Sequence, residues 1–289
     1  MQPGALNLLR ALWLTLPLTV GPAIEDALSS SSTPVAGVAA AELWLAWAAV
    51  LLALLVPRIV SLTVLRLALP ALVAVTVAAA GRGGVETVDL VAVTVAALVV
   101  VVGAWPTVGA DLVDGSSYGP EGRLPLRVPP TIAVALAPLA VVVLLAGLSI
   151  GPLLLAAGQW IVGGLAVVVG GGLVVLAARS LHALSRRFLV FVPGGVVVHD
   201  PMTIVEPVLL PKASLASIGP APTDTDAEDL TMGAGGLLME LRLRQPSDLL
   251  RRRPGRAPAE VISTAAVLVA PTRTAAVLAE ARERHLPVR

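Results

Sequence analysis

The chain has 289 residues, of which 56% are hydrophobic and 13% are charged. Soluble proteins carry about 25% charged residues, so this composition excludes a disordered tail, a coiled coil and an ordinary soluble domain. The net charge of +1 supplies no field that would attract nucleic acid, and the lack of Cys excludes disulfides and thiolate metal sites. The composition is that of an integral membrane protein in the lipid bilayer.

Six apolar segments occupy the first two thirds of the chain. A transmembrane helix needs about 17–25 apolar residues to cross a hydrocarbon core of roughly 30 Å. We expect transmembrane helices over residues 5–24, 35–56, 59–80, 90–105, 131–150 and 152–178. We expect the last two to be joined by a tight turn at Gly151–Pro152. The first segment contains Arg10, Pro17 and Pro22, and the alternative interpretation of it is a cleaved signal peptide.

The distribution of arginine predicts the orientation in the cell membrane, because short cytoplasmic loops are enriched in Lys and Arg. With the N-terminus inside, the outer flanks hold one arginine, Arg82, beside Glu25, Asp26, Glu86 and Asp89. The cytoplasmic flanks then hold seven, namely Arg10, Arg58, Arg123, Arg127, Arg179, Arg186 and Arg187. We therefore expect a multi-pass protein with both termini in the cytoplasm.

The loop over residues 106–130 is the longest in the helical half, and its Gly, Pro and charged residues predict turns and no helix. It contains Gly115-Ser116-Ser117-Tyr118-Gly119, which matches the Gly-x-Ser-x-Gly nucleophile pattern. That chemistry needs a strand before the serine and a helix after it, and neither is expected here. A hydrolase that uses Ser117 is therefore the least favoured of three hypotheses for the function. We expect no enzyme and no catalytic residue.

The composition changes after Arg187, and residues 188–289 are long enough for one small cytoplasmic domain, with residues 1–187 forming the transmembrane domain. Turn residues separate short apolar runs, which predicts a series of strands. The expected strands are 188–192, 196–199, 203–206, 208–210, 215–218, 237–243 and 261–269. Alanine and leucine at helical spacing predict a final helix over residues 272–285.

This order of strands and a terminal helix resembles the bacterial pleckstrin-homology-like domains. The likeness is carried by the hairpin Phe188–His199, the segment Leu209–Gly219 (LLPKASLASIG) and the closing strand and helix Val261–His285. The resemblance implies a small β-barrel or bent sheet plugged by a C-terminal helix. The basic headgroup pocket of some eukaryotic relatives has no match, because the first hairpin has no Lys/Arg cluster. The whole chain resembles uncharacterised actinobacterial multi-span membrane proteins that end in such a domain, a family that supplies no agreed activity.

The polar residues inside the apolar segments are candidates for function, because charge is expensive there. Glu42 and Arg66 are the only charges well inside a span, and about 10 Å of depth separates them at 1.5 Å per residue. Each has the alternative of reaching toward its nearer interface. The last span holds Gln159, expected to form hydrogen bonds within the bundle, and five glycines expected to let helices pack closely. These glycines are Gly163, Gly164, Gly170, Gly171 and Gly172.

Arginines of the cytoplasmic half are candidates for contact with anionic headgroups or a protein partner, since each contributes about 1 kcal/mol near such a surface. They are Arg186, Arg187, Arg251, Arg252 and Arg253, with Arg256 nearby. The acidic segment Asp224, Asp226, Glu228 and Asp229 resembles half of a calcium loop but lacks its glycine and final glutamate, so we expect a solvated loop. His199-Asp200-Pro201 predicts a turn with an Asx-type hydrogen bond. No metal or cofactor site is expected.

The sequence therefore predicts a bundle of about six transmembrane helices followed by a small β-rich cytoplasmic domain with a C-terminal helix. The favoured function is a non-enzymatic membrane protein whose soluble domain binds a cytoplasmic protein or the membrane surface. The alternative is a permease-like or lipid-handling protein that uses Glu42 and Arg66.

Overall fold

The computed structural model describes residues 4–81, 86–253, 255 and 257–289. The chain forms two compact units, each of which is built from two segments of sequence. The first unit takes in residues 1–112 and 137–181, and the second takes in residues 113–136 and 182–289. Arg82, used above to predict orientation, lies outside the described residues.

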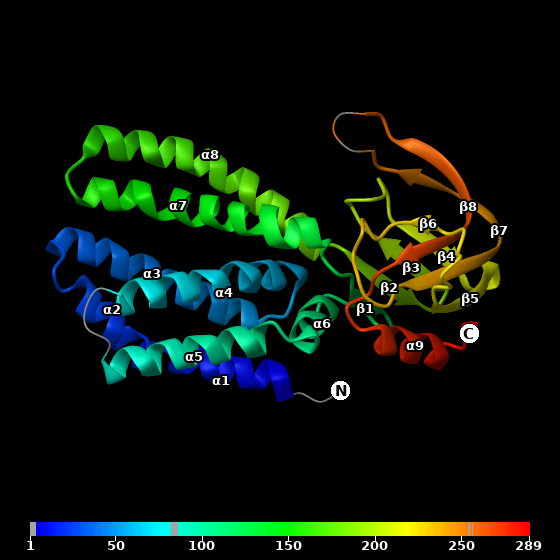
Figure 1. Ribbon diagram of the computed structural model, residues 1–289, viewed down its shortest axis with the longest axis horizontal. Helices are drawn as coiled ribbons and strands as arrows, with labels where there is room; N and C mark the ends of the chain where they lie inside the picture. The colour runs from blue at the N-terminus through cyan, green and yellow to red at the C-terminus, as the bar shows by residue number, and fades with distance from the viewer. Residues whose placement is uncertain (1–3, 82–85, 254, 256) are drawn as a thin grey trace. The chain divides into compact units, whose positions relative to one another are not determined.

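The first unit is all-helical (Figure 1). Its helices are α1 (Gly4–Thr19), α2 (Gly21–Leu28), α3 (Thr33–Leu55), α4 (Ile59–Ala80), α5 (Thr87–Gly103), α7 (Ala137–Ala156) and α8 (Trp160–Ser185). Within the described residues five stretches are long and apolar enough to cross a membrane, and α5 with α6 (Pro106–Asp114) would make a sixth that is bent by 59°. The predicted helical half, with five to six long apolar helices, is confirmed.

The turn expected at Gly151–Pro152 is wrong, because α7 continues through both residues to Ala156. The chain reverses at Gly158, whose φ of +79° is a conformation that glycine adopts without strain. The N–H of Gln159 donates to the carbonyl of Leu154 at 2.9 Å, and the N–H of Gly158 donates to Leu155 at 3.0 Å. These two bonds form a Schellman motif, which satisfies the last carbonyls of α7.

Side chains of α1 donate hydrogen bonds to backbone carbonyls of α3, and a side chain of α3 donates to a backbone carbonyl of α1. Pro17 has no N–H, so the helix leaves the carbonyl of Trp13 without its usual donor. The indole N–H of Trp47 donates to that carbonyl at 3.0 Å, and the indole N–H of Trp13 donates to the carbonyl of Trp47 at 3.1 Å. Arg10 donates through Nε and Nη2 to the carbonyl of Leu54 at the end of α3, at 2.9 and 2.7 Å. The proline and arginine that make the first segment atypical therefore hold two helices together.

The second unit contains two four-stranded sheets and one terminal helix. The first sheet has the order β1-β2-β3-β4 and the second the order β5-β7-β8-β6, in which only β6 and β8 pair in parallel. The strands are β1 (Gly122–Pro125), β2 (Phe188–Val192), β3 (Gly195–His199), β4 (Val208–Pro211), β5 (Leu215–Pro220), β6 (Glu228–Asp229), β7 (Met239–Arg251) and β8 (Glu260–Val269). The short helix η2 (Lys212–Ser214) joins the sheets, and α9 (Thr274–Glu283) closes the unit. Both sheets and α9 contribute to one core that includes Phe191, Leu241 and Val277.

The strand expected over residues 203–206 is wrong. This segment is a turn in which only Ile204 forms a bridge, with Arg251. Its N–H groups are engaged locally, because those of Thr203 and Ile204 both donate to the carbonyl of Asp200, at 3.1 and 3.0 Å. The other predicted strands and the final helix are present, and β7 extends eight residues beyond its predicted end.

The loop over residues 106–130 is not the turn-only segment predicted from its composition. It contains α6 and the strand β1, which pairs antiparallel with β2, from Gly122 opposite Phe191 to Pro125 opposite Phe188. Gly-Arg-Leu-Pro has little intrinsic strand preference, so this strand is created by the pairing offered by β2. A segment between two long helices thereby becomes part of the sheet-containing unit.

The C-terminal tail runs beside β5, in parallel, with Val288 opposite Ile218. The N–H of Ile218 donates to Pro287 at 2.7 Å, and the N–H of Arg289 donates to Ile218 at 3.0 Å. A Cβ on Gly219 would lie 2.3 Å from Cγ of Arg289. Glycine at this position is therefore what admits the tail, and the tail covers an edge that would otherwise be open.

Candidate functional site

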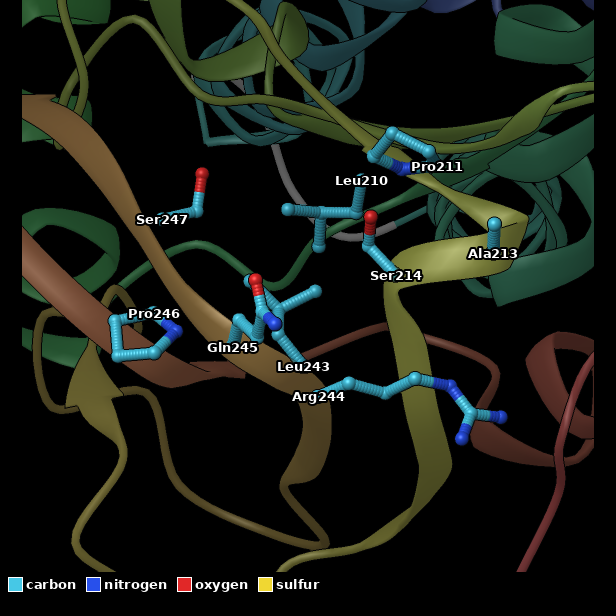
Figure 2. Close-up of a pocket in the computed structure, with 9 residues that line it drawn as sticks. All are labelled: Leu210, Pro211, Ala213, Ser214, Leu243, Arg244, Gln245, Pro246 and Ser247. Atoms are coloured by element: carbon cyan, nitrogen blue, oxygen red, sulfur yellow. The ribbon is translucent and has the colours of Figure 1, made fainter.

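A groove of about 380 Å³ lies on the second unit, between the end of β4, η2 and the middle of β7 (Figure 2). Leu210 and Leu243 are its buried residues, and Arg244, Gln245 and Pro246 are exposed on the β7 side. The remaining lining residues are Pro211, Ala213, Ser214 and Ser247. The groove thus combines apolar surface, a few uncharged polar groups and one cation.

The groove exists because β7 bends where it passes η2. The pairing of β7 with β8 slips between Arg242, opposite Ala266, and Ser247, opposite Thr264. Residues 243–246 of β7 therefore face the single residue Ala265 of β8, which is an enlarged bulge. Pro246 lies in this stretch, where its missing N–H costs no ladder hydrogen bond. Bulges commonly re-aim side chains beside functional sites, and this one turns 244–246 outward.

The polar groups of the groove come from both of its walls. In the view of Figure 2, Ser214 of η2 and Ser247 of β7 lie on either side of Leu210, and Arg244 extends away from Gln245 and Pro246. The serine hydroxyls and the Gln245 amide both donate and accept hydrogen bonds, whereas the guanidinium of Arg244 only donates. This lining suits a ligand with backbone-like polar groups, some apolar surface and negative charge near Arg244.

A buried carboxylate fixes β7 immediately before the bend. Glu240 is fully buried, and its Oε1 accepts from Nε of Arg242 at 2.8 Å and lies 3.2 Å from Nη1 of Arg289. Its Oε2 accepts from the hydroxyl of Thr225 at 2.5 Å. Arg242 also pairs with Asp226 at 2.5 Å. The cluster joins β7 to the acidic loop and to the C-terminus, and so positions the strand that forms one wall of the groove.

The charges of this cluster shift one another's pKa values. Burial alone would raise the pKa of Glu240, but hydrogen bonds from Arg242 and Thr225 and the charges of Arg289 and Arg242 outweigh burial, so its pKa is lowered. The hydrogen bond from Arg242 lowers the pKa of Asp226, and the two carboxylates raise the pKa of Arg242. Each of these shifts favours the charged form of Glu240, Asp226 and Arg242. The sequence signal for this cluster was the alternation of Glu240 and Arg242 on one face of a strand.

Arg187, a candidate for headgroup contact, lies in the interior of the second unit, with only 1% of its side chain exposed. Its Nη2 lies 2.7 Å from Oδ2 of Asp200, and its Nε donates to the same carboxylate at 2.9 Å. Its Nη1 donates to the carbonyl of Arg127 at 2.9 Å. Arg187 is thus unavailable to a headgroup and instead holds together the start of β2, the turn after β3 and the segment after β1.

The predicted Asx turn at His199-Asp200-Pro201 is confirmed, because the N–H of Met202 donates to Oδ1 of Asp200 at 3.1 Å. The ion pair of Asp200 with Arg187 was not foreseen. His199 stacks on Phe188 with ring centroids 4.5 Å apart, and its Nδ1 lies 2.7 Å from the carbonyl of Arg186. Through these contacts His199 packs within the β2–β3 hairpin.

The other candidate arginines are exposed but differ in their partners. Arg251 pairs with Glu228 at 2.5 Å, and Arg253 lies 4.0 Å from Glu260. Arg186 and Arg252 are exposed at different places in the sequence, before β2 and after β7. Arg256 lies outside the described residues. The structure therefore does not bring the five arginines together as one site.

The acidic segment is exposed at Asp224, Asp226 and Asp229, as expected of a solvated loop, but it is also held by specific contacts. Glu228 and Asp229 form β6, Asp226 pairs with Arg242, and Oδ1 of Asp229 accepts from the N–H of Thr231 at 2.7 Å. Within the described parts of the chain, no three His, Asp or Glu side chains gather as a metal site would require.

Ser117 lies in the turn between α6 and β1, so the order is helix, turn and strand, the reverse of a nucleophile elbow. Its hydroxyl donates to Oδ1 of Asp114 at 2.8 Å, and the same oxygen accepts from the N–H of Arg123 at 2.9 Å. The aspartate closes the turn, and the serine contributes to that closure.

The polar candidates of the helical half lie on different helices. Glu42 is on α3 and accepts a hydrogen bond from Ser149 of α7, whereas Arg66 is on α4, where it is half-buried. The expectation for Gln159 is wrong: it is exposed and precedes α8, since the chain reverses there. Close packing is confirmed for Gly163 and Gly170, and the other predicted glycines, Gly164, Gly171 and Gly172, have open space beside them.

Comparisons with known proteins add no assignment to this geometry, since no family model, no curated protein and no solved structure matches the chain.

Proposed function

We propose that this chain is an integral membrane protein whose sheet-containing unit binds an extended segment of a cytoplasmic partner protein in the groove beside β7. The observation that carries the proposal is the bulge at 243–246, which opens a groove lined by serine hydroxyls, the Gln245 amide and apolar side chains. The fold proposed for this unit is pleckstrin-homology-like. It is supported by two packed sheets and by α9, whose Val277 and Ala281 enter the core.

The membrane part of the proposal is supported by the surface of the helical unit. Large apolar side chains there are almost fully exposed, such as Ile161 at 88% and Leu18 at 81%. Soluble proteins rarely expose contiguous apolar patches larger than a few hundred Å². The excess of seven arginines over one on the predicted cytoplasmic flanks supports cytoplasmic termini, and with that orientation the groove faces the cytoplasm.

A protein partner is favoured over the membrane surface because the basic residues are dispersed or paired. Binding to anionic lipid needs several unpaired cations on one face, whereas Arg251 and Arg253 have acidic neighbours and Arg187 is buried. The groove has one exposed cation, Arg244, next to apolar and hydroxyl-bearing residues. We infer that the partner segment is extended and carries an acidic residue.

The test is site-specific photo-crosslinking in the native host, with the full chain in its membrane. A photoreactive residue at Ala213, in η2, should give one discrete crosslinked protein, and Arg244→Glu should reduce that product about tenfold by opposing charge. Arg282→Glu is the matched control, because Arg282 is exposed on α9, outside the groove. Equal crosslinking in both variants, or crosslinks to lipid alone, would contradict the proposal.

The alternative, a permease-like or lipid-handling protein, has one specific observation in its favour. The hydrogen bond from Ser149 to Glu42 links α7 to α3 through a half-buried acidic side chain, and intramembrane acids commonly serve transport. If this function holds, Glu42→Gln abolishes uptake or release of the solute while Arg244→Glu leaves it unchanged. The opposite pattern of effects supports partner binding.

A further inference from the structure

The helical unit contains a cavity of about 830 Å³ formed by α1, α2, α3 and α4. Residues that line it on α3 extend from Thr33 to Val50, about 25 Å at 1.5 Å per residue. Three of the five tryptophans, Trp13, Trp44 and Trp47, contribute to its wall. Its volume lies within the usual range for small-molecule sites, about 300–1,000 Å³.

The space exists because small residues occur where the helices approach one another. Ala36 and Ala40, four residues apart on α3, and Ala68 and Ala71, three apart on α4, all line the cavity. Residues at these spacings share one face of a helix. The break between α1 and α2 at Val20, followed by Pro22, prevents a straight helix from closing the gap.

The tryptophan side is rigid. The reciprocal hydrogen bonds between Trp13 and Trp47 fix both indoles, and Trp44 meets Trp47 edge to face with centroids 5.5 Å apart. The wall therefore keeps its shape without an occupant, which reduces the ordering cost of binding.

The cavity is polar at one end only. Glu25, Ser29, Ser31 and Thr33, around the α2–α3 connection, line that end, whereas the remainder is lined by Ala, Leu, Val, Ile, Pro, Gly and Trp. Glu25 is exposed and supplies negative charge. An apolar body with an acidic, hydroxyl-rich end is complementary to a molecule with a long apolar chain and a head group that donates hydrogen bonds or carries positive charge.

We propose that this cavity binds the chain of a single-chain amphiphile, with an amine-bearing head group at Glu25. One acyl chain reaches from the headgroup region to the middle of a hydrocarbon core of roughly 30 Å, which the length of the cavity accommodates. The inference rests on the membrane-spanning part of the proposed function and not on partner binding in the groove.

The experiment uses the full chain in detergent and a brominated alkylamine, with tryptophan fluorescence as the readout because bromine quenches nearby indoles. Saturable quenching is expected in the wild-type protein. Ala71→Phe fills the cavity and should weaken binding at least about tenfold, as forced overpacking does. Ala74→Phe is the matched control, because Ala74 is exposed on α4 and is not among the lining residues. It should leave binding unchanged.

A second set of measurements tests the polar end of the cavity without altering packing. Glu25→Gln should weaken binding of the amine about threefold, consistent with an exposed charge pair, and leave a brominated alkyl alcohol unaffected. The proposal is overturned if quenching does not saturate or is equal in Ala71→Phe and Ala74→Phe. It is also overturned if a second copy of the chain fills the cavity, which would be seen as a dimer that Ala71→Phe dissociates. Arg244→Glu should not change quenching, because Arg244 lies in the groove beside β7. A negative result for the amphiphile therefore does not count against partner binding in that groove, which the crosslinking experiment tests.

Discussion

At the scale of single residues, buried charges explain how the sheet-containing unit keeps its loops in place. The side chains of Arg187 and Asp200 are both buried. A buried guanidinium must have its hydrogen-bond donors satisfied to offset the cost of desolvation. Its donors reach a carboxylate and the carbonyl of Arg127, on separate segments of the chain. One side chain therefore defines how three segments meet.

Removing one partner of this pair should be strongly destabilising. Arg187→Met leaves the carboxylate of Asp200 buried without its cation, and we expect the second unit to lose about 3–5 kcal/mol. Amide hydrogen exchange of β2 and β3 in increasing urea measures this loss. The exposed neighbour provides the control, Arg186→Met, with a change within about 0.5 kcal/mol. The double variant Arg187→Met with Asp200→Leu should recover most of the stability, and no recovery would argue against the ion pair as the cause.

Glu240 should make the second unit sensitive to acid. Its pKa in the folded state lies below the ordinary value of 4.5. A lowered pKa means that its stabilising contribution is present above 4.5 and is lost as the pH falls through the folded-state value. Urea unfolding of the β7–β8 region between pH 7 and pH 3, followed by hydrogen exchange, should show this decline. In Glu240→Gln the same curve should be flatter and start from lower stability at pH 7, and parallel curves would contradict the assignment.

At the scale of elements, α7 and α8 run side by side because glycines permit close backbone approach (Figure 1). A Cβ on Gly170 would lie 2.8 Å from the carbonyl oxygen of Gly147, and a Cβ on Gly147 would lie 2.9 Å from that of Gly170. Since the obstacle is backbone, a rotamer change cannot relieve it. Gly171, one residue on, has nothing within 4 Å.

These two neighbouring glycines make a matched pair for a stability test. Gly170→Ala should push the helices apart and cost about 1–3 kcal/mol. Gly171→Ala should stabilise α8 by about 0.5–1 kcal/mol, because glycine within a helix is entropically unfavourable. The midpoint of thermal unfolding of the full chain in detergent, followed by circular dichroism, measures both. Equal midpoints would show that α7 and α8 do not pack through Gly170.

At the scale of the whole molecule, patterns of local origin could be predicted and long-range pairing could not. Apolar length predicted the long helices, turn residues predicted β2, β3, β5 and β8, and alanine and leucine at helical spacing predicted α9, since these signals lie within each segment. The end of α7 was misplaced because Gly151–Pro152 looks like a turn in isolation, whereas the Schellman bonds form at Gly158. The residues Gly122–Pro125 carry no local pattern that predicts a strand. They form one because they pair with the edge of β2.

The candidate site was less predictable than the fold for the same reason. The groove depends on the slipped register between β7 and β8. The residues on the two strands that this register pairs are not recognisable from their spacing in the sequence. Arg187 reads as a membrane-flanking cation, and its burial depends on Asp200, thirteen residues away. The charge alternation of Glu240 and Arg242 was visible, but the contribution of Arg289 depends on the tail returning to β5.

The predicted orientation has a direct test, aided by a chain without Cys. Ser30→Cys, in the exposed connection after α2, should react with a membrane-impermeant maleimide on intact cells. Thr223→Cys, exposed in the sheet-containing unit, should react only after the membrane is permeabilised. Labelling of Thr223→Cys in intact cells would place the sheet-containing unit outside and refute the orientation.

The strand β1 determines what a recombinant fragment must contain. A fragment starting at Phe188 would lack β1 and Arg187, so the edge of β2 would be bare and Asp200 would have lost its cation. Bare edges recruit other chains and favour aggregation. A soluble version should instead splice residues 113–128 to residues 185–289 through a short Gly/Ser linker that replaces the two intervening helices.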